Sequence, residues 1–370
     1  MNTSHVLINL KSISSHYDSI KSMVSNDCQI GAVVKANAYG LGSQKISEYL
    51  HYNNKCNLFF VATVEEGIML RYALQDDSIK ICVLNGLVRH METLFVDYSL
   101  IPVLNNSLQA KSWIKYSRYF NRRFPAVIHF DTGMSRTGFN IDEYNEVKED
   151  INDRLEVLFI MSHLACGDDK SNDKNDIQLR KFKDILNYLG NPKASLAASS
   201  GILLGKEYHF DIVRPGRLLY GFYDFKTDNQ ELKNSFSSVF NIYASIIDIN
   251  HIVKGTSVGY GAEFIAPKDM TTITIGIGYA DGIFRNLAKT TNNFCFFNDK
   301  KLPILGRISM DYMTLDASEI IDQIDEAQEA KITLLNPPSY SVVDMAHNLN
   351  TIPHEITCRL GNRITREYIK

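Results

Sequence analysis

The sequence predicts a (β/α)8 barrel followed by a mostly β domain. Short apolar runs recur at fairly even intervals in the N-terminal part of the chain, and segments with helical spacing lie between them. The runs are continuously hydrophobic, as a parallel strand covered on both faces requires. Strands that alternate with helices predict a barrel, although an open doubly wound sheet also fits the pattern. The eight runs are 30–36, 57–63, 79–86, 100–106, 125–133, 156–164, 193–199 and 209–216.

Two of the intervening segments show an apolar helical face. Residues 43–50 place Ile46, Tyr49 and Leu50 on one side of a predicted helix. The stretch 175–189 has the same spacing over a greater length and predicts a longer helix. Its apolar face consists of Ile177, Leu179, Phe182, Ile185, Leu186 and Leu189.

The pattern changes after residue 224. A polar stretch, 223–235, has the composition of a linker. The segments beyond it alternate or are rich in β-branched residues, with Gly or Pro near their ends, and helical spacing is scarce. These segments are 241–253, 270–282 and 302–316. We therefore expect a barrel domain over residues 1–228 and a β-strand-rich domain over residues 229–370.

The composition excludes several classes of protein. The formal net charge is −3 and no long basic run occurs, which argues against a nucleic-acid partner. The six cysteines lack C-x-x-C spacing, so neither a disulfide framework nor a metal site is expected, and a reducing compartment is favoured. The N-terminus lacks a signal-peptide pattern, and no stretch approaches the roughly 18–20 apolar residues of a membrane helix. We expect a cytoplasmic protein with no membrane partner.

Polar and ionisable residues follow the predicted strands at one end. Active groups of a barrel lie at the carboxyl ends of its strands. This clustering therefore predicts an enzyme rather than a barrel with merely solvated rims. The residues at these ends are Lys35 after the first strand, Asp131, Gly133 and Arg136 after the fifth, His163 after the sixth, Ser199 and Ser200 after the seventh, and Arg214 after the eighth.

Lys35 is the most informative of them. An apolar pocket lowers the pKa of a lysine and leaves the free amine that attacks a carbonyl. For a single residue, a lysine whose ammonium group reaches water is the simpler interpretation. Tyr39 and two glycines follow it, and hydroxyls and glycines occupy the loops after strands seven and eight, the usual phosphate site of a barrel. A lysine facing a phosphate site indicates pyridoxal 5'-phosphate (PLP), whose aldehyde forms a Schiff base with lysine. A Schiff-base aldolase acting on a phosphosugar fits these features as well.

Seven motifs, in order, resemble those of alanine racemases, which are fold-type III PLP enzymes. They are AVVKANAYGLG, HFDTGMSRTGF, SHLACGDD, FDIVRPGRLLYG, VGYGAEF, IGIGYADGIFR and GRISMDYMTLD. The resemblance runs from about residue 5 to the C-terminus. It implies a (β/α)8 barrel followed by a β domain, in agreement with the patterns above.

The resemblance implies two catalytic bases on opposite faces of the substrate. Lys35 matches the PLP lysine, and Tyr260 matches the opposing tyrosine, with His163 as its hydrogen-bonding partner. Racemisation needs this arrangement, because one face of a planar carbon loses a proton and the other gains one. Arg214 matches the arginine that faces the pyridine nitrogen and keeps it unprotonated, which favours reprotonation over transamination or decarboxylation.

The remaining site residues are assigned by the same resemblance. Phosphate contacts are Tyr39, Ser200 and Gly216. The substrate carboxylate is held by Arg136 and the backbone of Met310, beside which Asp311 positions neighbouring groups, and Tyr279 stands at the opening of the site. In this family the β domain of one subunit completes the barrel site of the other, which implies a homodimer acting on a small amino acid.

Three positions depart from the family pattern. His129 occupies the place of a lysine that is commonly carbamylated, and a histidine cannot carry that stable carbamate, so activity independent of bicarbonate is expected. Arg217 replaces an apolar residue beside the phosphate loop, where it either contacts the phosphate or points to the surface. His354 replaces a tyrosine that touches the phosphate and bounds the methyl pocket, so the pocket could admit serine.

The sequence therefore predicts interconversion of L- and D-alanine, which supplies D-alanine for peptidoglycan. A broader amino-acid racemase of the same fold remains open because of His129 and His354. An amino-acid decarboxylase of this fold is disfavoured by Arg214, since such enzymes usually pair the pyridine nitrogen with a carboxylate. A non-catalytic PLP carrier is disfavoured by the β domain and by Tyr260, neither of which a carrier needs.

Overall fold

The computed structural model describes residues 3–225, 230–324, 331–335 and 339–370 and contains two compact units. The barrel unit comprises Ile13–Tyr220 and Asp224–Phe236. The β unit comprises the chain up to Ser12, Gly221–Tyr223 and Ser237–Lys370. The expected domain boundary between residues 228 and 229 lies outside the described residues. Of the described helices, none is both long enough and apolar enough to cross a membrane.

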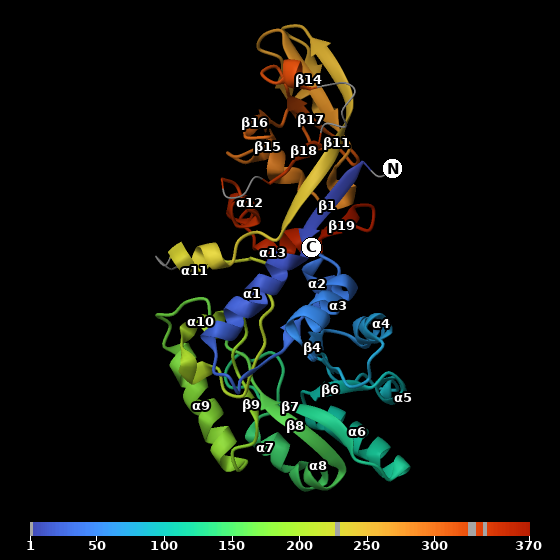
Figure 1. The fold of residues 1–370 in the computed structure, drawn as a ribbon, viewed down its shortest axis with the longest axis vertical. Helices are drawn as coiled ribbons and strands as arrows, with labels where there is room; N and C mark the ends of the chain where they lie inside the picture. The colour runs from blue at the N-terminus through green and yellow to red at the C-terminus, as the bar shows by residue number, and fades with distance from the viewer. Residues whose placement is uncertain (1–2, 226–229, 325–330, 336–338) are drawn as a thin grey trace. The chain divides into compact units, whose positions relative to one another are not determined.

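The barrel unit contains a ring of parallel strands (Figure 1). Seven of them pair in chain order: β3 (Ala32–Val33), β4 (Leu58–Val61), β5 (Lys80–Val83), β6 (Leu100–Leu104), β7 (Phe124–His129), β8 (Leu155–Met161) and β9 (Ala194–Ser195). The short β2 (Gln29–Ile30) directly precedes β3 and pairs with β10 (Ile212–Val213). Each predicted apolar run overlaps one of these strands.

Backbone hydrogen bonds close the ring through β10. On one side of β10, the amides of Gly31 and Val33 donate to the carbonyls of Val213 and Pro215, both at 2.9 Å. On the other side, the amide of Arg214 donates to the carbonyl of Ala197, also at 2.9 Å. The predicted barrel is confirmed, and the open-sheet alternative is wrong, because an open sheet would leave these strands unpaired.

Apolar side chains fill the interior of the barrel, as expected for a ring of eight strands. Phe60, Cys82, Val103 and Val127 are completely buried there. The cluster also contains Val33, Leu58, Ile101, Phe159, Met161 and Ile212.

Helices lie outside the ring of strands (Figure 1). They are α1 (Leu10–Met23), α3 (Ser43–Asn54), α4 (Val64–Leu74), α5 (Glu92–Asp97), α6 (Ser107–Phe120), α7 (Ile141–Asn145), α8 (Lys148–Arg154), α9 (Lys174–Tyr188) and α10 (Ser199–Leu204). Both helices predicted in detail are present, as α3 and α9. The prediction is wrong for one residue of the apolar face of α9: Ile177 is 51% exposed, and the polar Gln178 is buried instead.

The short element α2 (Lys35–Tyr39) is a left-handed turn. Ala36, Asn37, Ala38 and Tyr39 all have φ between +51° and +55°, a conformation that costs roughly 1–2 kcal/mol for each residue with a Cβ. Backbone bonds offset part of this cost, since the amide of Ala38 donates to the carbonyl of Val34 at 2.8 Å. The Asn37 carboxamide oxygen also accepts from the amide of Ser43 at 2.9 Å.

Glu66 on α4 holds this turn from outside. Its Oε1 accepts from the amide of Ala36 at 2.7 Å, and its Oε2 accepts from the amide of Ala62 at 2.7 Å. One carboxylate therefore ties the residue after Lys35 to the loop that follows β4. Both oxygens face N–H donors, which suits an ionised carboxylate and no amide.

The β unit is built mainly from strands, which confirms the second part of the fold prediction. Its long central strand is β11 (Phe240–Ile252), which pairs with β1 (Ser4–Asn9), β14 (Met270–Ile275) and β18 (Lys331–Thr333). The other strands are β12 (Ser257–Val258), β13 (Phe264–Ile265), β15 (Phe294–Phe297), β16 (Lys300–Pro303), β17 (Met313–Asp316) and β19 (Thr365–Ile369), and the short helices are α12 (Val342–Asn348) and α13 (Pro353–Cys358). The linker helix α11 (Gln230–Ser235) belongs to the barrel unit.

The first strand of the chain lies in this second unit. β1 is antiparallel to β11 and parallel to the last strand, β19, so both ends of the chain share one sheet (Figure 1). Val6 and Ile8 of β1 are completely buried. The β unit therefore depends on residues at the opposite end of the sequence.

We predict that Glu66→Gln destabilises the protein by about 1–3 kcal/mol, because an amide NH2 would face a backbone N–H donor. Thermal unfolding measures this loss as a lower midpoint temperature. Glu65→Gln is the matched control, since Glu65 is the exposed neighbour on the same helix. Equal midpoints for the two variants would contradict the role given to Glu66.

Candidate functional site

The predicted barrel residues gather at the carboxyl ends of the strands. Lys35 follows β3, His129 ends β7, His163 lies just after β8, and Arg214 directly follows β10. Parallel strands in a closed barrel end on the same rim, so these side chains share one surface of the barrel unit. The positive charges of Arg214, Arg136 and Lys35 all lower the pKa of His163, which places all three near its ring.

Arg214 is the most deeply buried ionisable group of this rim, at 3% exposure. Its Nη2 donates to the carbonyls of Ser162 at 2.6 Å and Leu196 at 3.3 Å, and its Nη1 donates to the hydroxyl of Ser195. Burial lowers the pKa of Arg214 to about 10, so the group stays cationic at neutral pH. No carboxylate among the described residues forms an ion pair with it.

Arg214 determines which ring nitrogen of His163 carries the proton. The Nη2 of Arg214 lies 3.5 Å from the Nδ1 of His163. Arginine only donates, so Nδ1 is the acceptor and a neutral ring carries its proton on Nε2. Burial, reinforced by the charge of Arg214, lowers the pKa of His163 to about 3. His163 is therefore a neutral hydrogen-bond donor through Nε2 at physiological pH.

His129 is locked in the opposite tautomer by Asn105. The amide nitrogen of Asn105 donates to the carbonyls of Leu84 and Val103 at 3.1 and 2.9 Å, which points its oxygen at His129. That oxygen lies 2.7 Å from Nδ1 of His129, so Nδ1 carries the proton and Nε2 keeps its lone pair. Burial and the charge of Arg214 lower the pKa of His129 to about 4. His129 supplies a neutral acceptor at the place of an anionic carbamate.

Asp131 orders the loop that carries Arg136. Its Oδ1 accepts from the amides of Gly133 and Met134, both at 2.8 Å, and from that of Ser135 at 3.1 Å. Burial raises the pKa of Asp131, but the three amides outweigh it and lower the pKa overall. Arg136 is exposed at the end of this ordered turn and can reach a solvent-borne carboxylate.

Gln178 is a site residue that sequence reasoning missed. Its amide nitrogen donates to the hydroxyl of Thr132 at 3.1 Å and to the carbonyl of His163 at 3.0 Å, and its oxygen accepts from the amide of Ala165 at 2.8 Å. It thereby joins the loops after β7 and β8. A polar residue on the apolar face of α9 was the available signal, because a buried amide needs partners of this kind.

Tyr39 meets the loop after β10. A Cβ on Gly216 would overlap the Tyr39 hydroxyl, so glycine at this position lets the two residues approach closely. The Tyr39 ring packs on that of Tyr220, with centroids 4.9 Å apart, and the Tyr220 hydroxyl donates to the carbonyl of Val33 at 2.8 Å. The structure thus brings together Tyr39 and Gly216, two of the three predicted phosphate contacts.

The two serines after β9 have different roles. Ser199 is buried, and its hydroxyl accepts from the amides of Gly216 at 2.9 Å and Leu218 at 3.2 Å. It therefore supports the loop after β10. Ser200 is half-buried, and its hydroxyl accepts from Nη2 of Arg217 at 2.9 Å. The surface-pointing alternative for Arg217 is wrong, because the side chain is half-buried and turned toward Ser200.

Tyr260 lies in the β unit, on a loop with unusual backbone geometry. It begins the 3-10 turn η2 (Tyr260–Ala262) and is flanked by Gly259 and Gly261 at φ +72° and +76°. Its side chain is 72% exposed within this chain. The flanking glycines allow the close approach of Arg307, whose guanidinium carbon would lie 3.0 Å from a Cβ on Gly261.

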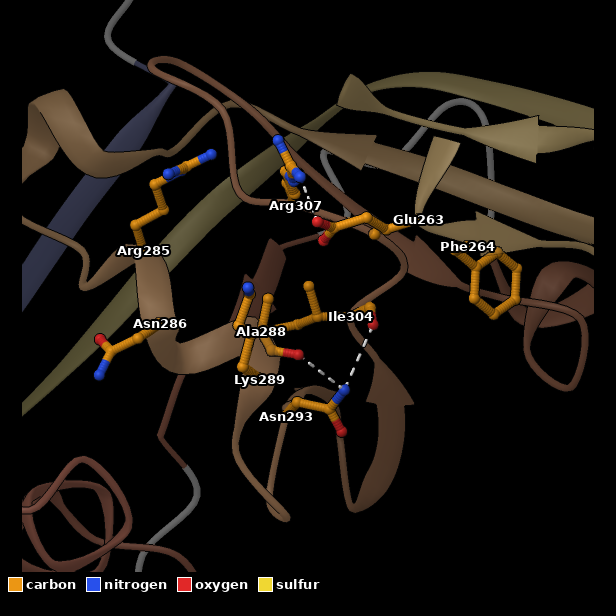
Figure 2. Close-up of a pocket in the computed structure, with 10 residues that line it drawn as sticks. Glu263, Phe264, Arg285, Asn286, Ala288, Lys289, Asn293, Ile304 and Arg307 are labelled. Atoms are coloured by element: carbon orange, nitrogen blue, oxygen red, sulfur yellow. Dashed lines mark hydrogen bonds and ion pairs between the residues drawn. The ribbon is translucent and has the colours of Figure 1, made fainter. Parts of the chain in front are cut away.

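A pocket of about 460 Å³ lies beside this loop in the β unit (Figure 2). Arg307 is ion-paired with Glu263 on one side of it, and Arg285 approaches from η4 (Arg285–Lys289) (Figure 2). The lining is completed by Phe264, Asn286, Ala288, Lys289, Asn293, Ile304 and Gly306. Cations outnumber the single carboxylate, so the surface next to Tyr260 favours anions.

Three other predicted residues are held together in the β unit. Tyr279 and Met310 lie side by side, since the amide of Ala280 donates to the carbonyl of Met310 at 3.0 Å. Arg363 bridges Asp311 at 2.8 Å and Asp281 at 3.2 Å, which anchors the segment after Met310.

The predicted site residues are thus divided between the two units. In the β unit, His354 is half-buried in α13. The β unit also carries Tyr260, Tyr279, Met310 and Asp311, whereas Lys35 and Arg214 belong to the barrel unit.

Comparison with known proteins agrees with this geometry. Residues 8–224 match the family model of the alanine racemase N-terminal domain, and residues 239–368 match that of the C-terminal domain. An alanine racemase of Rickettsia bellii is 41% identical over 92% of this chain and 81% of its own length. One from Brucella canis is 36% identical over 98% of this chain and 92% of its own.

Solved structures give the same result. The crystal structure of alanine racemase from Bartonella henselae with covalently bound pyridoxal phosphate superimposes with a TM-score of 0.89 at 36% identity, and all of both chains is covered. The biosynthetic alanine racemase of Pseudomonas aeruginosa gives a TM-score of 0.84 at 26% identity, again over all of both chains. This chain belongs to the alanine racemase family.

Proposed function

We propose that this protein is a PLP-dependent racemase that interconverts L-alanine and D-alanine, with Lys35 and Tyr260 as its two bases. The observation that carries the proposal is the environment of Arg214. A buried cation with only neutral partners among the described residues is costly unless a ligand supplies an electron pair. Arg214 lies on the same rim as the amine of Lys35. A pyridine nitrogen supplies such an electron pair without adding a proton.

The residues of the barrel unit fit PLP. When bound, PLP supplies an aldehyde that links to amines and a conjugated ring that acidifies the α-proton of an attached amino acid. Lys35 would hold the aldehyde carbon, and Arg214 would donate to the ring nitrogen. The close packing of Tyr39 on Gly216, beside the Ser200 hydroxyl, offers donors to a phosphate. The Arg214 guanidinium donates a hydrogen bond but keeps its proton at neutral pH, so the ring nitrogen would remain unprotonated.

Two bases explain how the configuration of the α-carbon is inverted. The Lys35 amine exchanges the α-proton on one face, and the Tyr260 hydroxyl exchanges it on the other. His163 would donate through Nε2 to the side-chain oxygen of Tyr260 and support its action as a base. Arg136 binds the substrate carboxylate together with the backbone of Met310, which keeps the α-carbon between the two bases.

We further propose a homodimer in which each β unit completes the barrel site of the other chain. The exposure of the proposed site residues of the β unit supports this arrangement. Within one chain Tyr260 is 72% exposed, Met310 52% and Tyr279 41%. Aromatic residues and methionine are enriched at protein interfaces, so their exposure here supports contact with a second chain. All six cysteines are free thiols, which suits a cytoplasmic location. The product D-alanine would serve peptidoglycan synthesis.

We predict that the wild-type enzyme in D2O incorporates deuterium at the α-carbon of both alanine enantiomers. Lys35→Ala should abolish interconversion, and Tyr260→Phe should lower the exchange of one enantiomer at least about 100-fold more than that of the other, because each base serves one face. Proton NMR of the α-position measures both rates. Tyr119→Phe is the control, since Tyr119 is an 80% exposed tyrosine on α6. Equal loss for both enantiomers in Tyr260→Phe would contradict the two-base assignment.

The shared site is tested by mixing the two inactive variants. A hybrid dimer of Lys35→Ala and Tyr260→Phe chains contains one site with both bases intact, so an equilibrated mixture should regain about a quarter of wild-type activity. A mixture no more active than its components would contradict the proposal that each β unit completes the barrel site of the other chain. The same deuterium assay with serine measures whether His354 widens the substrate range.

We predict that bicarbonate leaves the racemase rate unchanged, because His129 cannot form a stable carbamate. His129→Lys restores an amine that can take up carbon dioxide, so its rate should rise when bicarbonate is added. Initial rates with and without bicarbonate at constant pH and ionic strength measure both effects. Bicarbonate stimulation of the wild-type enzyme that is lost in His129→Ala would contradict the prediction.

A further inference from the structure

We propose that Arg217 is a charged ligand of the cofactor phosphate in this chain, an inference that rests on the proposed function. The other phosphate contacts assigned above, Tyr39, Ser200 and the backbone at Gly216, are all neutral. Arg217 would add a full positive charge to that set.

The position of the guanidinium carries the proposal. Arg217 directly follows Gly216 in the loop after β10, and its Nη2 donates to the Ser200 hydroxyl at 2.9 Å. Gly216 in turn lies against the Tyr39 hydroxyl. Three groups from three different parts of the barrel rim therefore converge next to one cation. A phosphate that contacts Tyr39, Ser200 and Gly216 would lie within reach of Arg217.

Packing keeps the side chain in this position. The guanidinium carbon lies 4.1 Å from the ring centroid of Phe225, which stacks on it and limits its rotation. The residue is half-buried, and burial lowers the pKa of Arg217, but arginine remains charged at any physiological pH. The conformational entropy of the long Arg217 side chain is thus already reduced in the free protein, so binding a ligand would cost less.

The guanidinium retains donors for a ligand. It has five N–H groups, and Ser200 accepts from one of them in the described part of the chain. A phosphate monoester carries about −1.5 to −2 charges at neutral pH, and the planar fork of arginine matches two of its oxygens. A bond of this kind is roughly twice as strong as one between neutral groups.

If Arg217 had only a structural role, its replacement would affect cofactor binding differently. The charges of Asp168 and Asp224 also act on Arg217, so the side chain could serve only to connect two loops. Loss of such a connection would disturb the whole rim. It would weaken the binding of every form of the cofactor, whether or not that form carries a phosphate.

Equilibrium binding to the apoenzyme separates the two roles. We expect Arg217→Leu to bind PLP about tenfold more weakly than the wild type and to bind pyridoxal, which lacks the phosphate, within about twofold of it. The PLP affinity of Arg217→Lys should lie between those of the wild type and Arg217→Leu, because lysine keeps the positive charge but loses the planar pair of N–H donors. Arg122→Leu is the matched control, an arginine near an aromatic ring, Phe124, at the opposite end of the strands. Absorbance titration of the cofactor measures all affinities.

Two results would overturn the inference. One is unchanged PLP affinity in Arg217→Leu, and the other is an equal loss of affinity for PLP and pyridoxal. In both cases the proposed function survives if the wild type binds PLP and racemises alanine. A wild-type chain that binds neither compound would refute the proposed function itself together with this inference.

Discussion

The barrel rim depends on one buried guanidinium whose partners in the described structure are all neutral. Arg214 closes the ring of strands through its backbone, which bonds to Ala197, and connects the segments after β8 and β9 through its side chain. A cation in such a place is stable only while every acceptor around it stays in position. Fold and chemistry are therefore coupled at this residue, since the charge that orders the rim also decides which ligand the rim accepts.

The same charge sets the protonation of its surroundings. Burial lowers the pKa of His163, and the charge of Arg214, which donates to one ring nitrogen, lowers it further, so His163 is neutral. His129, farther along the rim, is neutral for the same electrostatic reason and is oriented by Asn105. These two histidines are a fixed donor and a fixed acceptor near neutral pH, which suits the proposal that only Lys35 and Tyr260 move protons.

Much of this could be predicted from the sequence. Continuous apolar runs located every barrel strand, and the rule for strand ends located Lys35, His163 and Arg214. The pairing of β1 in the β unit could not be predicted, because strand partners at opposite ends of a chain leave no local signal. Ile177 was placed in the core by helical spacing, whereas burial of the neighbouring Gln178 depends on partners in two separate loops.

The turn after Lys35 shows another limit of pattern reading. Its sequence, KANAY, contains no glycine, so nothing in it signals four residues with positive φ. The conformation is imposed by tertiary partners, above all the carboxylate of Glu66, which is distant in sequence. Strain at a functional site is commonly maintained in this way. Here it places the Lys35 amine and the Tyr39 hydroxyl on one short segment.

The central claim is that Arg214 holds the ring nitrogen of PLP without a proton, and nitrogen NMR tests it most directly. The enzyme reconstituted with PLP labelled with 15N in the ring should give the chemical shift of an unprotonated pyridine that accepts a hydrogen bond, and the shift should not titrate across the neutral pH range. A shift typical of pyridinium would contradict the account, because it would show that the buried site supplies a proton where we expect only a guanidinium donor.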